Sequence, residues 1–138
     1  LIEMCFSGKY SEEELKELIT KKGGLVSHLG TSDARDVVKM IAEGNEYAKL
    51  VYDAMIYQVA KEIGAQSVVL KGKVDAIILT GGMAYDEYFI KTLKEYISFI
   101  GKVVIIPGEE EMQALSNGVL RVLNGEEKAQ EYTGVPVK

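Results

Sequence analysis

The chain has 138 residues, of which 47% are hydrophobic and 27% are charged, a composition typical of one folded domain or part of one. Its 16 basic and 21 acidic residues give a net charge of −5, which argues against a nucleic-acid-binding role because that role requires a basic surface. One cysteine, Cys5, and one histidine, His28, exclude an intrachain disulfide and a metal centre built from several of either residue.

The first residues lack the basic segment and long apolar core of a secretory signal, and no apolar run reaches the ~18–20 residues of a membrane span. We therefore predict a cytoplasmic, reducing environment and no membrane partner. Because the chain begins at Leu1 rather than Met, we expect a fragment of a longer protein. Cys5 lies in a short apolar stretch and is predicted to belong to the core.

Capping residues and apolar periodicity predict two short helices in the first third of the chain. Ser11–Glu14 forms a capping box, in which the serine hydroxyl and the glutamate side chain each accept a backbone N–H bond at a helix start. The segment Gly24–Gly30 is expected to be an irregular or extended connection, with His28 in a structural hydrogen-bonding role. Thr31–Asp33 then offers an N-cap for a second helix that continues to about Ile41.

The longest predicted helix follows Asn45, and it either bends at Gly64 or continues to about Leu70. Apolar residues cover most of its sides, which predicts burial between two layers. The eight tyrosines of the chain, most of them on predicted helices, are expected to serve packing. Residues 73–80 and 103–106 form nearly continuous apolar runs, typical of strands in a parallel sheet covered on both faces. A helix is predicted between them, and a last helix over 110–123 with its apolar residues turned inward.

The element order is therefore a set of helices followed by β-α-β-α. A strand–helix–strand unit predicts a parallel pair with a right-handed crossover, and so an α/β fold with helices packed on a small parallel sheet. Two strands that are both expected to be buried on two faces need further strands beside them. This predicts, from the residues alone, that part of the fold lies outside the chain.

The first candidate site lies where the strand over 73–80 ends at Gly81 and Gly82, followed by Met83 and a predicted helix. In open α/β sheets ligands bind beyond the carboxyl ends of the strands, and glycine lets a ligand approach the backbone. The following helix N-terminus is expected to offer free N–H groups. The alternative is a tight strand-to-helix turn without a ligand. The spacing matches neither a Rossmann fingerprint nor a P-loop.

Two further candidates lie at predicted helix starts. In Ser32-Asp33-Ala34-Arg35, the guanidinium can stack on a base or pair with a phosphate, and the alternative is a capped helix in which an aspartate pairs with Arg35. In Glu109–Glu111, one carboxylate can serve Mg²⁺ directly or through water, and the alternative is the ordinary preference of acids for a helix N-terminus.

These constellations, in this order, closely resemble the C-terminal part of the butyrate kinases, more than the related acetate kinases. The resemblance covers nearly the whole chain and rests on the stretches Met4–Tyr10, Ser27–Arg35, Leu70–Gly82 and Pro107–Met112. Both families belong to the superfamily of sugar kinases, actin and heat-shock ATPases. The resemblance implies a partial ribonuclease-H-like (actin-like ATPase) domain, in a protein whose two such domains enclose a nucleotide cleft.

The resemblance also implies an activity, transfer of the γ-phosphoryl of ATP to a short-chain carboxylate with Mg²⁺, giving an acyl phosphate and ADP. Residues Gly81, Gly82 and Met83 would line the adenosine pocket, with Asp86 nearby. The stretch Ser32, Asp33, Ala34 and Arg35 is similar to a segment that holds adenosine, although Ala34 replaces a residue that is often bulky and apolar. Glu110 is the candidate for the metal, and Glu109 stands where the related pattern has Asn.

On this basis residues 1–138 are the C-terminal part of the second, nucleotide-side domain, and the N-terminal domain and phosphate loops lie outside them. We expect this chain by itself to be inactive and its parent to be homo-oligomeric. The preferred acid, whether butyrate or another short-chain fatty acid, depends on a pocket largely outside the chain. The alternatives are a non-catalytic nucleotide-binding module and an oligomerisation module.

Overall fold

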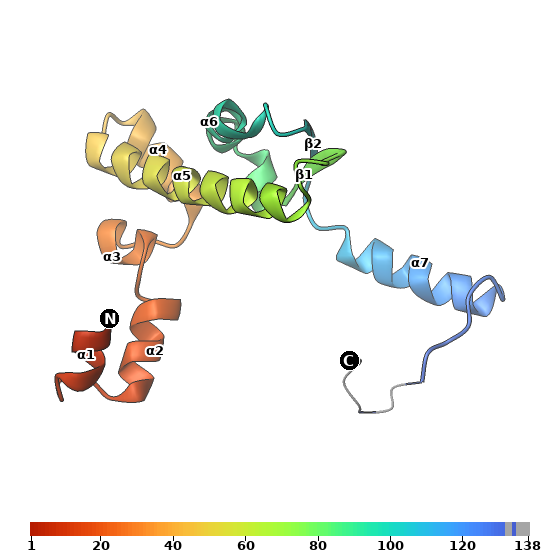
Figure 1. Cartoon of the computed structure of the whole chain (residues 1–138), viewed down its shortest axis with the longest axis horizontal. Helices are drawn as coiled ribbons and strands as arrows, with labels where there is room; N and C mark the ends of the chain where they lie inside the picture. The colour runs from red at the N-terminus through yellow and green to blue at the C-terminus, as the bar shows by residue number, and fades with distance from the viewer. Residues whose placement is uncertain (132–133, 135–138) are drawn as a thin grey trace. The chain divides into compact units, whose positions relative to one another are not determined.

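The computed structural model describes residues 1–131 and 134. The chain divides into two compact units, Leu1–Pro107 and Gly108–Lys138, and each is described here by itself. The elements of the first unit, labelled in Figure 1, are α1 (Ile2–Phe6), α2 (Glu12–Thr20), α3 (Leu25–Leu29), α4 (Ala34–Ala42), α5 (Glu46–Val69), β1 (Ala76–Gly81), the 3₁₀ helix η1 (Gly82–Tyr85), α6 (Glu87–Ile97) and β2 (Lys102–Pro107). The second unit contains α7 (Glu111–Leu123).

The two strands pair in parallel, from Ala76 beside Lys102 to Gly81 beside Pro107. The crossover between them contains η1 and α6, so the predicted β-α-β-α order and parallel pair are confirmed. Within the described residues the sheet has these two strands and no others.

Only one face of this sheet is covered. Ile77, Leu79 and Val103 pack against the buried core, whereas Ile78 and Ile106 are 61% and 52% exposed. The prediction that both strands are buried on two faces is therefore wrong for this chain. Successive side chains of a strand point to opposite faces, and the helices of the unit cover only one of them.

The core lies between α4, α5, α6 and the covered face of the sheet. Its fully buried large side chains are Val37 of α4, Tyr52 and Ile56 of α5, and Leu93 and Ile97 of α6. The buried residues of α5 recur every four positions and form one stripe: Ala48, Tyr52, Ile56 and Ala60.

Other apolar residues of α5 are exposed, among them Leu50 at 65% and Tyr57 at 46%. The prediction that α5 is buried between two layers is therefore wrong, because α4 and α6 pack along one side of it. Of the two alternatives for the end of this helix, the longer one is correct: α5 extends to Val69, with Leu70 as its C-cap.

The capping box at the start of α2 is confirmed. The Ser11 hydroxyl accepts a bond from the Glu14 amide at 3.2 Å, and the Glu14 carboxylate accepts one from the Ser11 amide at 2.7 Å. The hydrogen bonds lower the pKa of the Glu14 carboxyl, because they favour its ionised form.

The segment expected to be an irregular or extended connection instead contains the short helix α3. It lies between Gly24 and Gly30, whose φ values of 59° and 75° are in the region that favours glycine. Five residues are too few to show a helical period in the sequence. The expected structural role of His28 is confirmed, since its Nδ1 lies 2.8 Å from the Tyr47 hydroxyl.

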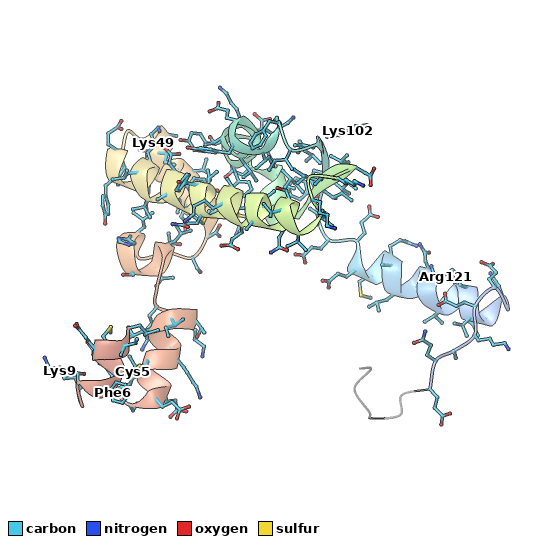
Figure 2. All side chains as sticks on the ribbon, viewed as in Figure 1. Cys5, Phe6, Lys9, Lys49, Lys102 and Arg121 are labelled. Carbon is cyan, nitrogen blue, oxygen red and sulfur yellow. The ribbon has the colours of Figure 1, made fainter. Side chains whose placement is uncertain are left out.

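Two expectations of burial fail near the ends of the chain. Cys5 is exposed on α1, which has no buried residue, so it does not belong to the core (Figure 2). The apolar stripe of α7 is likewise exposed rather than turned inward: Met112, Leu115, Val119, Leu120 and Leu123. Periodicity identifies an amphipathic helix, but it does not show whether another element covers that helix. In the described part of the chain, no helix is both long and apolar enough to cross a membrane.

We predict that the stability of the first unit depends on the apolar side chains that are buried, such as Leu93 of α6, and not on exposed apolar side chains such as Leu50. Leu93→Ala removes a fully buried side chain and should reduce the free energy of unfolding by about 2–5 kcal/mol. The matched change Leu50→Ala, at a residue that is 65% exposed, should cost less than about 0.5 kcal/mol. Urea denaturation of the full chain measures both, and equal losses would contradict this description of the core.

Candidate functional site

A hollow of about 1160 Å³ opens between the start of α4 and the segment that joins β1 to α6. It is somewhat larger than the ~300–1,000 Å³ of typical small-molecule pockets. It is lined by Ser32, Asp33, Ala34, Arg35, Val38, Gly82, Met83, Tyr85, Asp86, Glu87 and Tyr88. Two sequence-predicted segments thus meet at one hollow. Of their eight predicted residues, Gly81 is the one that does not line it.

The glycine pair that ends β1 has two different roles. Gly81 has φ 80° and ψ −173°, a conformation that side chains disfavour, so it makes the sharp exit from the strand. Gly82 has no positive φ, and a Cβ built on it would meet nothing within 4 Å. A side chain is therefore permitted at Gly82 by the backbone, and its absence leaves space in the hollow.

The element after the glycines differs from the expectation. A four-residue 3₁₀ helix, η1, comes before α6, and Asp86 is the N-cap of α6. The Asp86 Oδ1 accepts bonds from the amides of Tyr88 and Phe89, at 2.9 and 3.1 Å. The prediction that the helix start offers these amides to a ligand is therefore wrong, because the aspartate side chain already occupies them.

Asp86 also joins the hollow to the core. Its Oδ2 accepts a 2.5 Å bond from the hydroxyl of the buried Tyr52 on α5. Burial, and next the bond to Asp86, raise the pKa of Tyr52 above its ordinary value, so this phenol remains a donor. One carboxylate therefore holds the start of α6 and the middle of α5 together.

A second connection holds Tyr88 in place. Its hydroxyl donates a 2.6 Å bond to Asp53 of α5, which pairs with Lys49 at 2.6 Å. The bond to Asp53 raises the pKa of Lys49. The rings of Tyr88 and Tyr52 stack with centroids 6.1 Å apart. The α6 wall of the hollow is thus fixed to α5 at both Asp86 and Tyr88.

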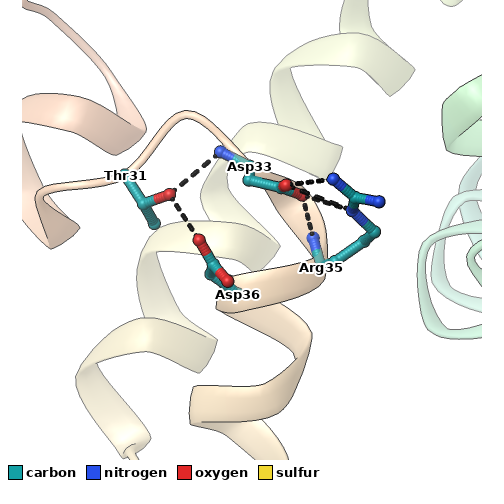
Figure 3. A network of polar contacts seen from close by, with 4 residues as sticks. All are labelled: Thr31, Asp33, Arg35 and Asp36. Carbon is teal, nitrogen blue, oxygen red and sulfur yellow. Dashed lines mark hydrogen bonds and ion pairs between the residues drawn. The ribbon is translucent and has the colours of Figure 1, made fainter.

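The opposite wall is a capped helix start (Figure 3). The Asp33 carboxylate accepts a 2.9 Å bond from the Arg35 amide and further bonds from Nε and Nη2 of the same arginine. The Thr31 hydroxyl accepts a bond from the Asp33 amide and donates one to Asp36. The capped-helix alternative, in which an aspartate pairs with Arg35, is confirmed. It leaves the guanidinium paired with Asp33 beside the hollow, with the Arg35 side chain 91% exposed.

The charges that line the hollow are predominantly acidic. The lining contains three acidic residues, Asp33, Asp86 and Glu87. It contains one basic residue, Arg35, which is paired with Asp33. An acidic lining disfavours phosphate groups, which carry negative charge. The hollow therefore suits a neutral, planar group with hydrogen-bond donors better than it suits a phosphate.

The acidic run before α7 belongs to the second unit. Glu109, Glu110 and Glu111 are all exposed, and Glu110 is the N-cap of α7 without a capping bond from its side chain. Among the described residues, no group of three or more His, Cys, Asp or Glu side chains is arranged to hold a metal. A lone carboxylate fits a magnesium ion whose other ligands are waters and substrate phosphates, so Glu110 stays a prediction.

Four residues of the hollow were not predicted as site residues: Val38, Tyr85, Glu87 and Tyr88. Three of them follow Gly82 within six positions, and this proximity to the glycine pair is the signal that could have identified them. The prediction that the tyrosines serve packing holds for Tyr52 and Tyr88. It fails for Tyr85, which is 70% exposed.

Comparison with known proteins assigns the chain to a family. The model of the acetokinase family matches residues 6–118, and the chain belongs to that family. The chain is similar to a probable butyrate kinase 2 of Caldanaerobacter subterraneus subsp. tengcongensis, at 53% identity over 132 residues. The match includes 96% of this chain and 37% of that protein, so the chain spans little more than a third of the relative's length.

Two solved structures share the fold. Porphyromonas gingivalis acetate kinase matches with a TM-score of 0.71 at 24% identity, over 86% of this chain and 36% of that one. A propionate kinase from Francisella tularensis subsp. tularensis matches with a TM-score of 0.68 at 23% identity, over 80% of this chain and 35% of that one. The predicted α/β class and partial actin-like ATPase fold are confirmed, as is the resemblance to the butyrate kinases.

We predict a pH signature for the α4 wall. The bonds from Arg35 lower the pKa of Asp33 from 3.8 to about 2, so this pair contributes stability above about pH 4 and loses it as the pH falls towards 2. In Arg35→Gln the pKa should rise towards 3.8 but stay below it, because the backbone amide still donates. A carboxyl NMR titration measures this shift. The control Lys39→Gln removes one cation elsewhere on α4 and should leave the pKa of Asp33 near 2. If Arg35→Gln also leaves the pKa of Asp33 unchanged, Arg35 is not the residue that lowers it.

Proposed function

We propose that this chain supplies the adenosine side of the nucleotide site in a short-chain carboxylate kinase, whose whole protein transfers the γ-phosphoryl of ATP to butyrate. The observation that carries the proposal is the hollow that Ser32–Arg35 forms together with Gly82, Met83, Tyr85 and Asp86. The 53% identity to a probable butyrate kinase supports butyrate as the acceptor. In this proposal residues 1–138 are the C-terminal part of the nucleotide-side domain.

The reaction needs positioning more than covalent chemistry. A carboxylate oxygen of butyrate attacks the γ-phosphorus while the bond to the ADP oxygen breaks, so the products are butyryl phosphate and ADP. The contribution of this chain is to hold the nucleoside end of ATP. The acidic lining would direct the phosphates out of the hollow, towards the groups that perform the transfer.

Magnesium belongs to the proposal through Glu110. When bound, the ion would neutralise charge on the phosphate oxygens. Glu110 would hold it directly or through a water, because its exposed carboxylate makes no capping bond to α7. We further propose that the whole protein is cytoplasmic and homo-oligomeric.

Nucleotide binding tests the site directly. Isothermal titration of MgADP into the full chain should show binding, and Gly82→Leu should weaken it about tenfold or more because the side chain enters the hollow. The matched control is Gly64→Leu in α5, where a Cβ also meets nothing within 4 Å. Gly64→Leu should leave the affinity unchanged. Equal effects of the two variants, or no binding by the folded chain, would contradict the proposed site.

We also expect that the chain alone forms no butyryl phosphate from ATP and butyrate, because phosphoryl transfer requires charge stabilisation from several sides and the hollow offers one paired cation. Trapping acyl phosphate as its hydroxamate measures the product. Product formation by the purified chain that is lost in Gly82→Leu would show that these residues contain a complete kinase site.

A further inference from the structure

Tyr85 lines the hollow, but among the described residues its side chain makes no hydrogen bond or ring contact. It closes η1 and is 70% exposed, although it lines the hollow. Within the described part of the chain, its ring has no aromatic partner and its hydroxyl no hydrogen bond. The other tyrosine of the hollow, Tyr88, is stacked on Tyr52 and bonded to Asp53, so it cannot turn towards a ligand without losing these contacts.

The surroundings of Tyr85 favour a flat, uncharged ligand. The wall on α4 presents the small side chain of Ala34, which leaves room beside it for a ring, and the planar guanidinium of Arg35, which is paired with Asp33. Planar rings gain most from stacking on an aromatic face, whereas the acidic lining disfavours a phosphate at the same place.

We propose that Tyr85 is the base-stacking residue of this site, and that it contacts the purine ring of the nucleotide through its aromatic face. This inference rests on the proposed function, because it assigns a ligand group to the same hollow. The phenol hydroxyl has no role in it. The prediction is therefore that an aromatic ring at position 85, rather than tyrosine itself, sets the affinity for the base.

The test uses the full chain and three probes, adenosine, ADP and inorganic pyrophosphate, each measured by isothermal titration. Stacking on an aromatic ring predicts that Tyr85→Ala weakens adenosine and ADP binding by about 5- to 150-fold. Tyr85→Phe should remain within about twofold of the wild type, because the ring face is retained. Tyr85→Leu, which keeps apolar area without an aromatic face, should behave like Tyr85→Ala.

Tyr10→Ala is the matched control, because Tyr10 is also exposed, at 41%, and lies outside the hollow. It should leave all affinities unchanged. Far-ultraviolet circular dichroism should show the same helix content in every variant, since the Tyr85 side chain is 70% exposed and has no hydrogen bond or ring contact among the described residues.

The outcomes separate the two proposals. If the wild type binds adenosine and Tyr85→Ala binds it equally well, Tyr85 does not stack on the base, and the nucleotide site itself stands. If the folded wild type binds neither adenosine nor ADP, both proposals fail. If Tyr85→Phe loses as much affinity as Tyr85→Ala, the hydroxyl carries the interaction and the stacking role is wrong. Binding of pyrophosphate that Tyr85→Ala weakens equally would assign the hollow to phosphate instead.

Discussion

The Asp86 carboxylate is the contact on which the geometry of the hollow depends. One of its oxygens caps α6, and the other accepts the phenol of Tyr52, a side chain with no exposed surface in the centre of the core. The strand exit at Gly81 and the 3₁₀ turn after it are thereby tied to α5. Without this carboxylate, two helix-start amides and a buried hydroxyl would need new partners, and each unsatisfied group is costly. The wall formed by η1 and the start of α6 is consequently anchored to the core through Asp86.

The two walls of the hollow are built by the same local device. Asp33 caps α4 and binds the Arg35 guanidinium, and Asp86 caps α6 and binds Tyr52. The carboxylate oxygens of both aspartates accept hydrogen bonds from other groups of the protein. They shape the hollow and give it negative charge, and Ala34, Gly82 and Tyr85 are among the other residues that line it. The hydrogen bonds that cap α4 and α6 therefore also determine the shape of the proposed site.

Local chemistry explains which features could be predicted from the sequence. The Ser11 capping box, the β-α-β-α order and the strand exit at two glycines depend on residues close together in the chain, and all are present. Family resemblance then selected Ser32–Arg35, Gly81, Gly82, Met83 and Asp86, and the fold brings all of these except Gly81 to one hollow. Burial depends on distant elements and failed more often: for Cys5, for the outer face of the sheet and for the apolar stripe of α7. Tyr85 was missed for the same reason, since an exposed and a packed tyrosine are identical in sequence.

In the proposed site, two segments about fifty residues apart in the sequence bind one nucleoside. This can be tested by mapping amide chemical-shift changes while adenosine, which carries no phosphate, is titrated into the nitrogen-15-labelled full chain. The changes should cluster in residues 32–35 and 82–88 together and follow one binding curve. Changes confined to only one of these segments, or located on α7 or α2, would contradict it.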